Sequence, residues 1–454
     1  MKPVKTTLFI AWAALALHFQ AIAQAYEVSF ESEASVPVVY LNVALKAGAA
    51  TDPQGKSGLT HFLAEMLLRG TRARSKQQLD LALDQMGARL DVETRAESMI
   101  LRGAVLSTQL EPFLNLVSEV ITQPNFPESE IQKLKKETIS SLLEELGNDA
   151  SLANRKFYQF LFRGHPYGNP ILGKAKDVES LKRADLLAHY DSVVRDSLLL
   201  VVGSGDASQE TVQTWTKKLS QALPAENRVA ALKPVATPIN PKGRRLILID
   251  KPERTQTQIN GGQVGTRMTD PQFFPLYLGN FAFGGGSFSA RMMVEIRVKR
   301  GWSYGANTFF RHGLQPRSWQ FHLFPKEKDT PAALEYSLKM LEDLKAKGLT
   351  LDEYQFAQQS LVNSSGFMFD TPKKRVENTL LEKTLNLPLG FMKSYGPELQ
   401  KIKLEQVNAA LNQFILPEQQ TIVIVGTAKN LKEPLAKAAG LKVDQVEVVP
   451  YTQD

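Results

Sequence analysis

The chain repeats a pattern of short segments, and this repetition restricts the possible fold more than any other feature. The tripeptide Asp-Pro-Gln occurs at 52–54 and again at 270–272, each time before an apolar helical stretch. The apolar run LLLVVG at 198–203 is likewise matched by TIVIVG at 421–426. The offsets, 218 residues (270 − 52) and 223 residues (421 − 198), are similar and keep the same order. The repetition therefore predicts two tandem units of about 200 residues built from the same succession of elements.

Each unit reads as strand, helix, further strands, long helices and a last apolar strand that ends in Gly. The segments VVYLNVALKAG (38–48) and TIVIVG are rich in β-branched residues and are bounded by Gly, which predicts strands. A long helix is predicted from Pro127 and Glu128 to Leu146, with Gly147 after its end. Residues 224–244 contain four prolines and no sustained periodicity, which indicates a linker. We therefore predict an N-terminal domain over 24–223 and a C-terminal domain over 245–454.

The first residues are typical of a secretory signal peptide. Lys2 and Lys5 precede an apolar run from Leu8 to Phe19, and Ala21-Ile22-Ala23 follows as a cleavage pattern, so we predict a signal peptide over 1–23. The run is short for a bilayer span, and no stable membrane insertion is expected; an uncleaved anchor is the alternative. The chain has no Cys. An exported protein without disulfides fits the periplasm of a Gram-negative bacterium.

The distribution of charged residues argues against nucleic acid as a binding partner. Hydrophobic residues make up 43% and charged residues 22%, as in folded globular proteins. The net charge is +7, yet no dense run of Lys and Arg and no nucleic-acid motif is present. We therefore expect no nucleic-acid partner.

Residues 58–70, GLTHFLAEMLLRG, look like a zinc-binding helix that has lost its chemical groups. In an H-x-x-E-H motif two His on one helix face bind zinc and the Glu serves as general base. This chain has His61, then Ala64 at the position of the base and Glu65 at the position of the second His. One imidazole and one carboxylate, four residues apart, make at best a weak metal site.

With its flanks DPQGKSG and RGT, this segment resembles the pitrilysin (insulinase) family of metallopeptidases, which includes mitochondrial processing peptidase. The resemblance implies a third zinc ligand, a Glu about 76 residues after the second His. Counting from Glu65 leads to Ser141, and the family spacing to the turn His165-Pro166-Tyr167-Gly168 leads to the same serine. We therefore expect no metal in this chain.

The second half keeps a different family pattern, FGGGSFSARMMVEIRVKRGWSY at 283–304. The resemblance implies that Gly284, Gly285, Gly286 and Ser287 form a substrate-binding loop. It further implies that Arg297 and Tyr304, seven residues apart, bind the substrate carbonyl and the developing oxyanion. A guanidinium and a phenol are suitable preorganised donors for that charge. The alternative is that both side chains only pack.

The resemblance implies an α+β fold: two tandem homologous α/β-sandwich domains that form half of a clamshell, so that two chains enclose a chamber. Three hypotheses follow for function. The first is a non-catalytic subunit of a periplasmic, heterodimeric zinc endopeptidase, in which a zinc-bearing paralogous partner supplies the metal and this chain supplies Arg297 and Tyr304 for peptide substrates. The second is a homodimeric peptide-binding or scaffold protein. The third is an autonomous enzyme whose site uses His61, Glu65 and a distant group such as Glu144 or Glu145.

Overall fold

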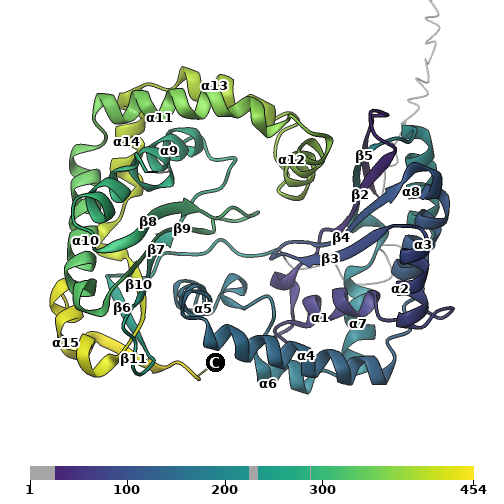
Figure 1. Cartoon of the computed structure of the whole chain (residues 1–454), viewed down its shortest axis with the longest axis horizontal. Helices are drawn as coiled ribbons and strands as arrows, with labels where there is room; N and C mark the ends of the chain where they lie inside the picture. The colour runs from purple at the N-terminus through teal and green to yellow at the C-terminus, as the bar shows by residue number, and fades with distance from the viewer. Residues whose placement is uncertain (1–25, 224–233, 287, 454) are drawn as a thin grey trace, which may run out of the picture.

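Two mixed β-sheets with surrounding helices make up the protein, and they stand opposite each other (Figure 1). The structure, a computed structural model, describes residues 26–223, 234–286 and 288–453. The predicted signal peptide, the first part of the predicted linker and Ser287 lie outside these residues.

The first sheet has five strands in the order β1-β5-β2-β4-β3. Strands β1 and β5 are parallel, and the other neighbours are antiparallel. The strands are β1 (Glu27–Ser32), β2 (Val38–Leu45), β3 (Arg89–Thr94), β4 (Met99–Leu106) and β5 (Leu199–Gly205).

The second sheet repeats this arrangement in the order β6-β10-β7-β9-β8 and adds β11 beside β6. Its strands are β6 (Arg245–Asp250), β7 (Gln258–Val264), β8 (Ser303–Phe310), β9 (Ser318–Pro325), β10 (Thr421–Gly426) and β11 (Val446–Pro450). The two repeated apolar runs become β5 and β10, which occupy the same place in the two sheets. The predicted duplication, and with it the α+β fold, is confirmed.

The helices of the two halves also follow one another in similar order. The first half contains α1 (Leu59–Leu67), α2 (Lys76–Gln85), α3 (Leu110–Thr122), α4 (Glu128–Gly147), α5 (Asp149–Leu161), α6 (Ala175–Ser180), α7 (Arg183–Val193) and α8 (Gln209–Ala222). The second contains α9 (Phe273–Asn280), α10 (Thr330–Lys347), α11 (Leu351–Ser364), α12 (Pro372–Thr384), α13 (Tyr395–Lys401), α14 (Leu404–Phe414) and α15 (Ala428–Ala438). The predicted long helix is α4, within one residue of its expected end.

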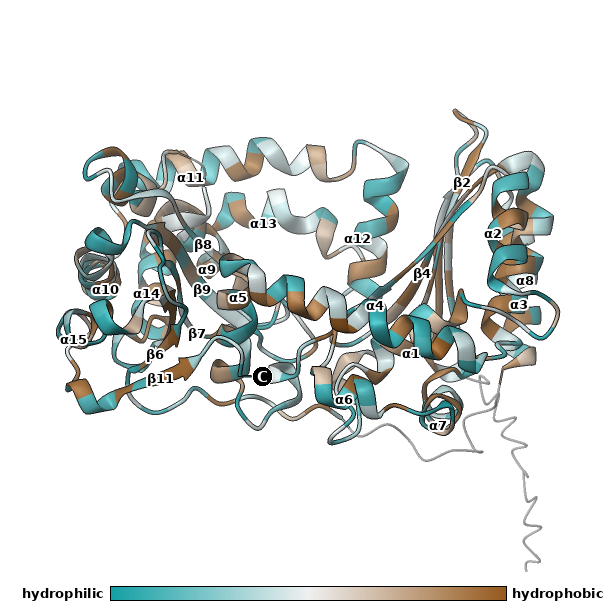
Figure 2. Ribbon diagram, turned by 60° about the horizontal axis from the view of Figure 1, so that its bottom comes forward, coloured by the Kyte–Doolittle hydropathy of each residue, from teal (hydrophilic) through white to brown (hydrophobic). Residues whose placement is uncertain are grey.

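The central strands of the sheets, such as β6, are apolar on both faces because helices cover them on both sides. Successive side chains of a strand point to opposite faces. In β6, Leu246 and Leu248 join the large core of the second half, whereas Ile247 and Ile249 pack with Phe157 of α5. Figure 2 shows the hydrophobic colour gathered on the strands of both sheets. This double cover explains why the strands read as continuous apolar runs rather than alternating ones.

The inner cover of each sheet comes from the other half of the chain. Helix α5, from the first half, lies on β7 and β10 of the second sheet. Helix α12, from the second half, lies on β5 and β2 of the first sheet, where Val376 and Leu380 pack with Ala44, Leu200 and Val202. The two halves are therefore interlocked by an exchange of helices.

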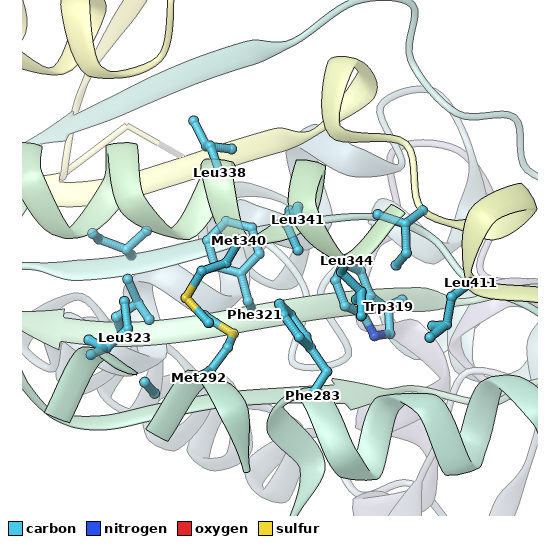
Figure 3. Close-up of a cluster of buried hydrophobic side chains, with 14 of the residues drawn as sticks. Phe283, Met292, Trp319, Phe321, Leu323, Leu338, Met340, Leu341, Leu344 and Leu411 are labelled. Carbon is cyan, nitrogen blue, oxygen red and sulfur yellow. The ribbon is translucent and has the colours of Figure 1, made fainter. Parts of the chain in front are cut away.

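A large core lies beneath the segment that contains Arg297. Phe283 and Met292, from either side of the Gly-rich stretch, belong to one buried cluster with Phe321 of β9 and Met340 of α10 (Figure 3). Trp319 is also buried there, and its ring nitrogen donates a hydrogen bond to Asn280 Oδ1 (2.8 Å). This core fixes the backbone on both sides of the Gly-rich stretch between Phe283 and Met292.

No helix among residues 26–223, 234–286 and 288–453 combines the length and apolar character needed to cross a bilayer.

Candidate functional site

Helix α1 is held at its first turn by a buried carboxylate. Asp52 accepts hydrogen bonds from Gly58 N (2.7 Å), Thr60 N (2.8 Å) and Thr60 Oγ1 (2.6 Å). Gly58 has φ +92°, and a Cβ there would lie 2.8 Å from Leu172 O, so only glycine fits. The motif that precedes the helix therefore positions it without taking part in metal chemistry.

The four positions of the degenerate zinc motif offer one imidazole and one carboxylate. His61 is half-buried, and burial lowers the pKa of its imidazole to about 4, so the ring is neutral at pH 7. Ala64 is fully buried and offers no proton acceptor. Glu65 is half-buried, while Ser141 is exposed on α4. No group of three His, Cys, Asp or Glu residues that could hold a metal ion occurs within the described parts of the chain.

Glu137, one helical turn before Ser141, is the residue of α4 whose negative charge raises the pKa of Glu65. Burial raises the pKa of Glu65, Arg69 lowers it, and the charges of Glu137 and Asp91 raise it further. Arg69 in turn binds Glu137 (2.5 Å) and Glu130 (3.3 Å), and these two ion pairs link the end of α1 to α4. Glu137 was not predicted, because the family spacing points to Ser141; the spacing of Glu130 and Glu137 along one face of α4 is the signal in the sequence that indicates it.

The three glycines of the loop are required by packing. A Cβ on Gly284 would lie 2.6 Å from Thr308 Oγ1, and one on Gly285 would lie 2.6 Å from Asn280 Nδ2. A Cβ on Gly286 would lie 2.9 Å from Phe281 O, the oxygen that accepts the hydrogen bond of Gly286 N (2.7 Å). The π-helical segment Phe281–Gly285 is thus pressed against β8.

Arg297 and Tyr304 lie together on the surface of the second half. Arg297 is in the last turn of the π-helical segment Met293–Val298, and its Cζ is 4.1 Å from the ring centroid of Tyr304 and 4.7 Å from that of Phe288. The side chain of Tyr304 is 73% exposed and that of Phe288 is 60% exposed. The arrangement is a guanidinium between two aromatic rings that are open to solvent.

A β-bulge directs Tyr304 outward. The register of β8 against β9 shifts between Ser303 and Ala306, so that Tyr304 and Gly305 fall in the irregular part of this edge strand. The Ser303 hydroxyl donates to Gly305 O (2.6 Å) and accepts from Phe324 N (2.9 Å), which replaces the missing ladder contacts. Bulges at sheet edges commonly re-aim a side chain in this way.

Arg297 differs from its cationic neighbours because it has no acidic partner. Lys299 and Arg300 both bind Glu295, and Arg291 binds Glu353. Burial disfavours the Glu295 carboxylate, but Lys299, Arg300 and Tyr336 outweigh burial and lower its pKa to about 2. The guanidinium of Arg297 makes no ion pair or hydrogen bond with any residue in the ranges the structure describes. Its guanidinium N–H groups therefore remain available for a ligand.

The family follows from comparison with known proteins. A family model described as insulinase (peptidase family M16) matches residues 27–175, and one described as the peptidase M16 inactive domain matches residues 180–361. The chain belongs to the insulinase family, M16, also known as the pitrilysin family.

Two relatives indicate the range of proteins to which the chain is similar. A Helicobacter pylori protein named non-peptidase homolog YmxG is 24% identical over 426 residues, which cover 94% of this chain and 98% of that protein. A protein of Rickettsia felis named as an uncharacterized zinc protease is 25% identical over 274 residues, which cover 60% of this chain and 65% of that protein.

Solved structures share the fold. A peptidase M16 inactive domain from Pseudomonas fluorescens superposes with a TM-score of 0.83 at 24% identity and covers 89% of this chain and 96% of that one. A Helicobacter pylori protease gives a TM-score of 0.82 at 16% identity, with 89% and 98% covered. The two-domain fold predicted from the sequence is therefore that of the family.

Proposed function

We propose that the protein is the non-catalytic, substrate-binding subunit of a two-subunit zinc endopeptidase of the periplasm. A zinc-bearing paralogous subunit supplies the metal, its ligands and the general base that activates water. This chain supplies Arg297 and Tyr304 to the carbonyl of the peptide under attack, where the two donors stabilise the developing negative charge.

One observation supports this proposal above all others. The zinc half of the family pattern has lost its base and two of its ligands, whereas the half-buried Arg297 contacts the exposed Tyr304 and has no acidic partner among the described residues. Arg291, Lys299 and Arg300 all have carboxylate partners, whereas Arg297 keeps its guanidinium beside Tyr304 without one.

Reconstitution tests the proposal. The purified chain is assayed for bound zinc and for peptide hydrolysis, alone and after mixing with an M16 protein that has an intact H-x-x-E-H motif and comes from the same cell. We expect no zinc and no hydrolysis from the chain alone, and hydrolysis from the mixture. Stoichiometric zinc with activity in the chain alone would favour the autonomous enzyme, and inactivity throughout would favour the scaffold.

Substitution of Arg297 tests its role. We expect Arg297→Ala to lower kcat/KM of the reconstituted pair by about 10²–10³, as for removal of an oxyanion donor, while the subunits still co-elute in gel filtration. Lys299→Ala is the matched control, because Lys299 is an exposed neighbouring cation that already binds Glu295. Equal activity of the Arg297→Ala and Lys299→Ala pairs would contradict the role proposed for Arg297.

A further inference from the structure

A cavity of about 620 Å³ lies between the two halves of the chain. The turn between β3 and β4, helix α5 and residues 167–172 line it from the first half, and the β8–β9 loop and the end of α12 line it from the second. It is separate from Arg297 and Tyr304, neither of which lines it. The outermost strand of the first sheet, β3, ends at its wall with Glu93 and Thr94.

Buried polar atoms without a partner are concentrated around this cavity. Thr94 Oγ1, Glu97 Oε1, His312 Nδ1 and Arg317 Nε are all inaccessible to solvent and have no hydrogen-bond partner among the described residues. Such atoms are uncommon in native proteins, where more than nine in ten buried polar groups are paired. Their concentration in the wall of one cavity marks a polar region that the described residues leave incompletely hydrogen-bonded.

The charges that line the cavity leave an excess of unpaired arginine. Arg95 is bound to Glu93 (2.6 Å) and Arg155 to Glu145 (3.0 Å), so these charges are balanced. Arg311 and Arg317 form no ion pair within the part of the chain that the structure describes, and the remaining carboxylate of the lining, Glu97, interacts with the Tyr167 hydroxyl. Two positive charges against one negative charge favour an anionic ligand group.

Two tyrosines hold Arg317 in place for a planar partner. Its Cζ lies 4.7 Å from the ring centroid of Tyr167 and 5.8 Å from that of Tyr158. Both rings are fixed through their hydroxyls, since Tyr167 Oη accepts from Gln315 N (3.1 Å) and Tyr158 Oη donates to Gln320 Oε1 (3.0 Å). A guanidinium that rests on aromatic rings keeps its N–H edge for a carboxylate, which it can bind with two parallel hydrogen bonds.

We infer that this cavity binds the carboxylate of a peptide through Arg317 and Arg311. The carboxylate is either the C-terminal one or that of an acidic side chain, because both present the same planar group. The inference rests on the proposed function in one respect, namely that the ligand is a peptide.

Binding of defined peptides to the full chain alone tests this inference. The probes are four N-acetylated octapeptides of alanine, serine and leucine, with a free or amidated C-terminus and with Glu or Gln at one internal position. We expect a peptide with a carboxylate at the recognised place to bind at least about tenfold more tightly than the amidated Gln peptide, by calorimetry. The pair that shows the difference identifies the source of the carboxylate.

Substitutions connect the preference to the cavity. Arg317→Ala and, separately, Arg311→Ala should each weaken the preference for the carboxylate peptides, whereas Arg72→Ala, at an exposed arginine that does not line the cavity, should retain it. Arg317→Lys serves if Arg317→Ala fails to fold, as judged by circular dichroism. Equal binding of all four peptides, or a preference that survives both alanine substitutions, would overturn the inference.

These measurements need no zinc-bearing partner. A chain that prefers carboxylate peptides but gives no hydrolysis with any such partner would contradict only the two-subunit proposal. Hydrolysis by the pair without a carboxylate preference would contradict only the role of the cavity.

Discussion

His61 and Arg297 illustrate how the surroundings of single side chains separate the two halves of the family pattern. His61 is half-buried and neutral at pH 7, and its ring makes no hydrogen bond to the described residues. Arg297 lies at the surface beside two aromatic rings, and the carboxylate of Glu295, two residues before it, is bound by Lys299 and Arg300. His61 is present without the other zinc-motif residues, whereas Arg297 is present together with Tyr304.

The buried histidines predict how stability depends on pH. Burial lowers the pKa of His61 and His189 to about 4, and burial together with Arg311 does the same for His312. In the unfolded chain these rings titrate near pH 6.5, so the unfolded state takes up protons first as the pH falls. Asp52 acts in the opposite sense, because burial raises its pKa to about 6. Burial also lowers the pKa of His322 and raises that of Glu65, so four histidines oppose two carboxyls and the free energy of unfolding should fall from about pH 6.5 to pH 4.

A His61→Asn variant checks this prediction by urea unfolding at pH 7 and pH 5. The variant lacks one of the groups that titrate, so it should lose less stability between the two pH values than the natural chain does. An unchanged loss would mean that His61 is protonated as readily in the folded state as in the unfolded one.

At the scale of elements, α12 shows how a helix is held by a small apolar contact and several ion pairs. Val376 and Leu380 are the buried apolar side chains of this helix. Around them, Arg102 of β4 binds Glu377, Arg375 binds Glu31 (2.9 Å), and Lys383 binds Glu27 (3.1 Å). Because these pairs are partly exposed, each contributes on the order of 0–1 kcal/mol, and the apolar contact decides the attachment.

We therefore expect Leu380→Ala to lower the free energy of unfolding by about 2–5 kcal/mol, the usual cost of emptying a buried leucine site. Leu389→Ala is the matched control, because Leu389 is 90% exposed and should change stability by less than about 0.5 kcal/mol. Urea unfolding of the two variants measures the difference. Similar stabilities would show that α12 is not part of the cooperative core.

At the scale of the whole molecule, the exchange of α5 and α12 makes the two halves depend on each other. Without α5, the inner face of the second sheet, including Ile247, Ile249, Val423 and Val425, has no cover. Without α12, the first sheet loses the cover of Leu200 and Val202. Exposed apolar patches of this kind favour association and aggregation.

Expression of the halves as separate fragments tests this dependence. We expect fragment 245–454 to be insoluble or aggregated by itself and to become soluble when fragment 24–223 is co-expressed, with both eluting together in gel filtration. A soluble, monomeric 245–454 fragment would show that the cover by α5 is dispensable.

The sequence by itself determined the duplicated order of elements, the strands at 38–45 and 421–426, and the loss of chemical groups at Ala64, Glu65 and Ser141. These depend on residue identity and on local periodicity, which are encoded within a few residues of each position. The pairing of Arg297 with Tyr304 was implied by the family resemblance, but neither their contact nor the bulge that turns Tyr304 outward was.

Only the tertiary structure decided which surfaces meet. It placed Glu137 rather than Ser141 beside Glu65, required glycine at 284 because Thr308 lies against it, and brought residues 93–98 and 311–317 to one cavity. Such contacts join residues that are tens to hundreds of positions apart in the chain. They are set by how helices and sheets pack, and by the exchange of α5 and α12, for which no local pattern in the sequence provides a signal.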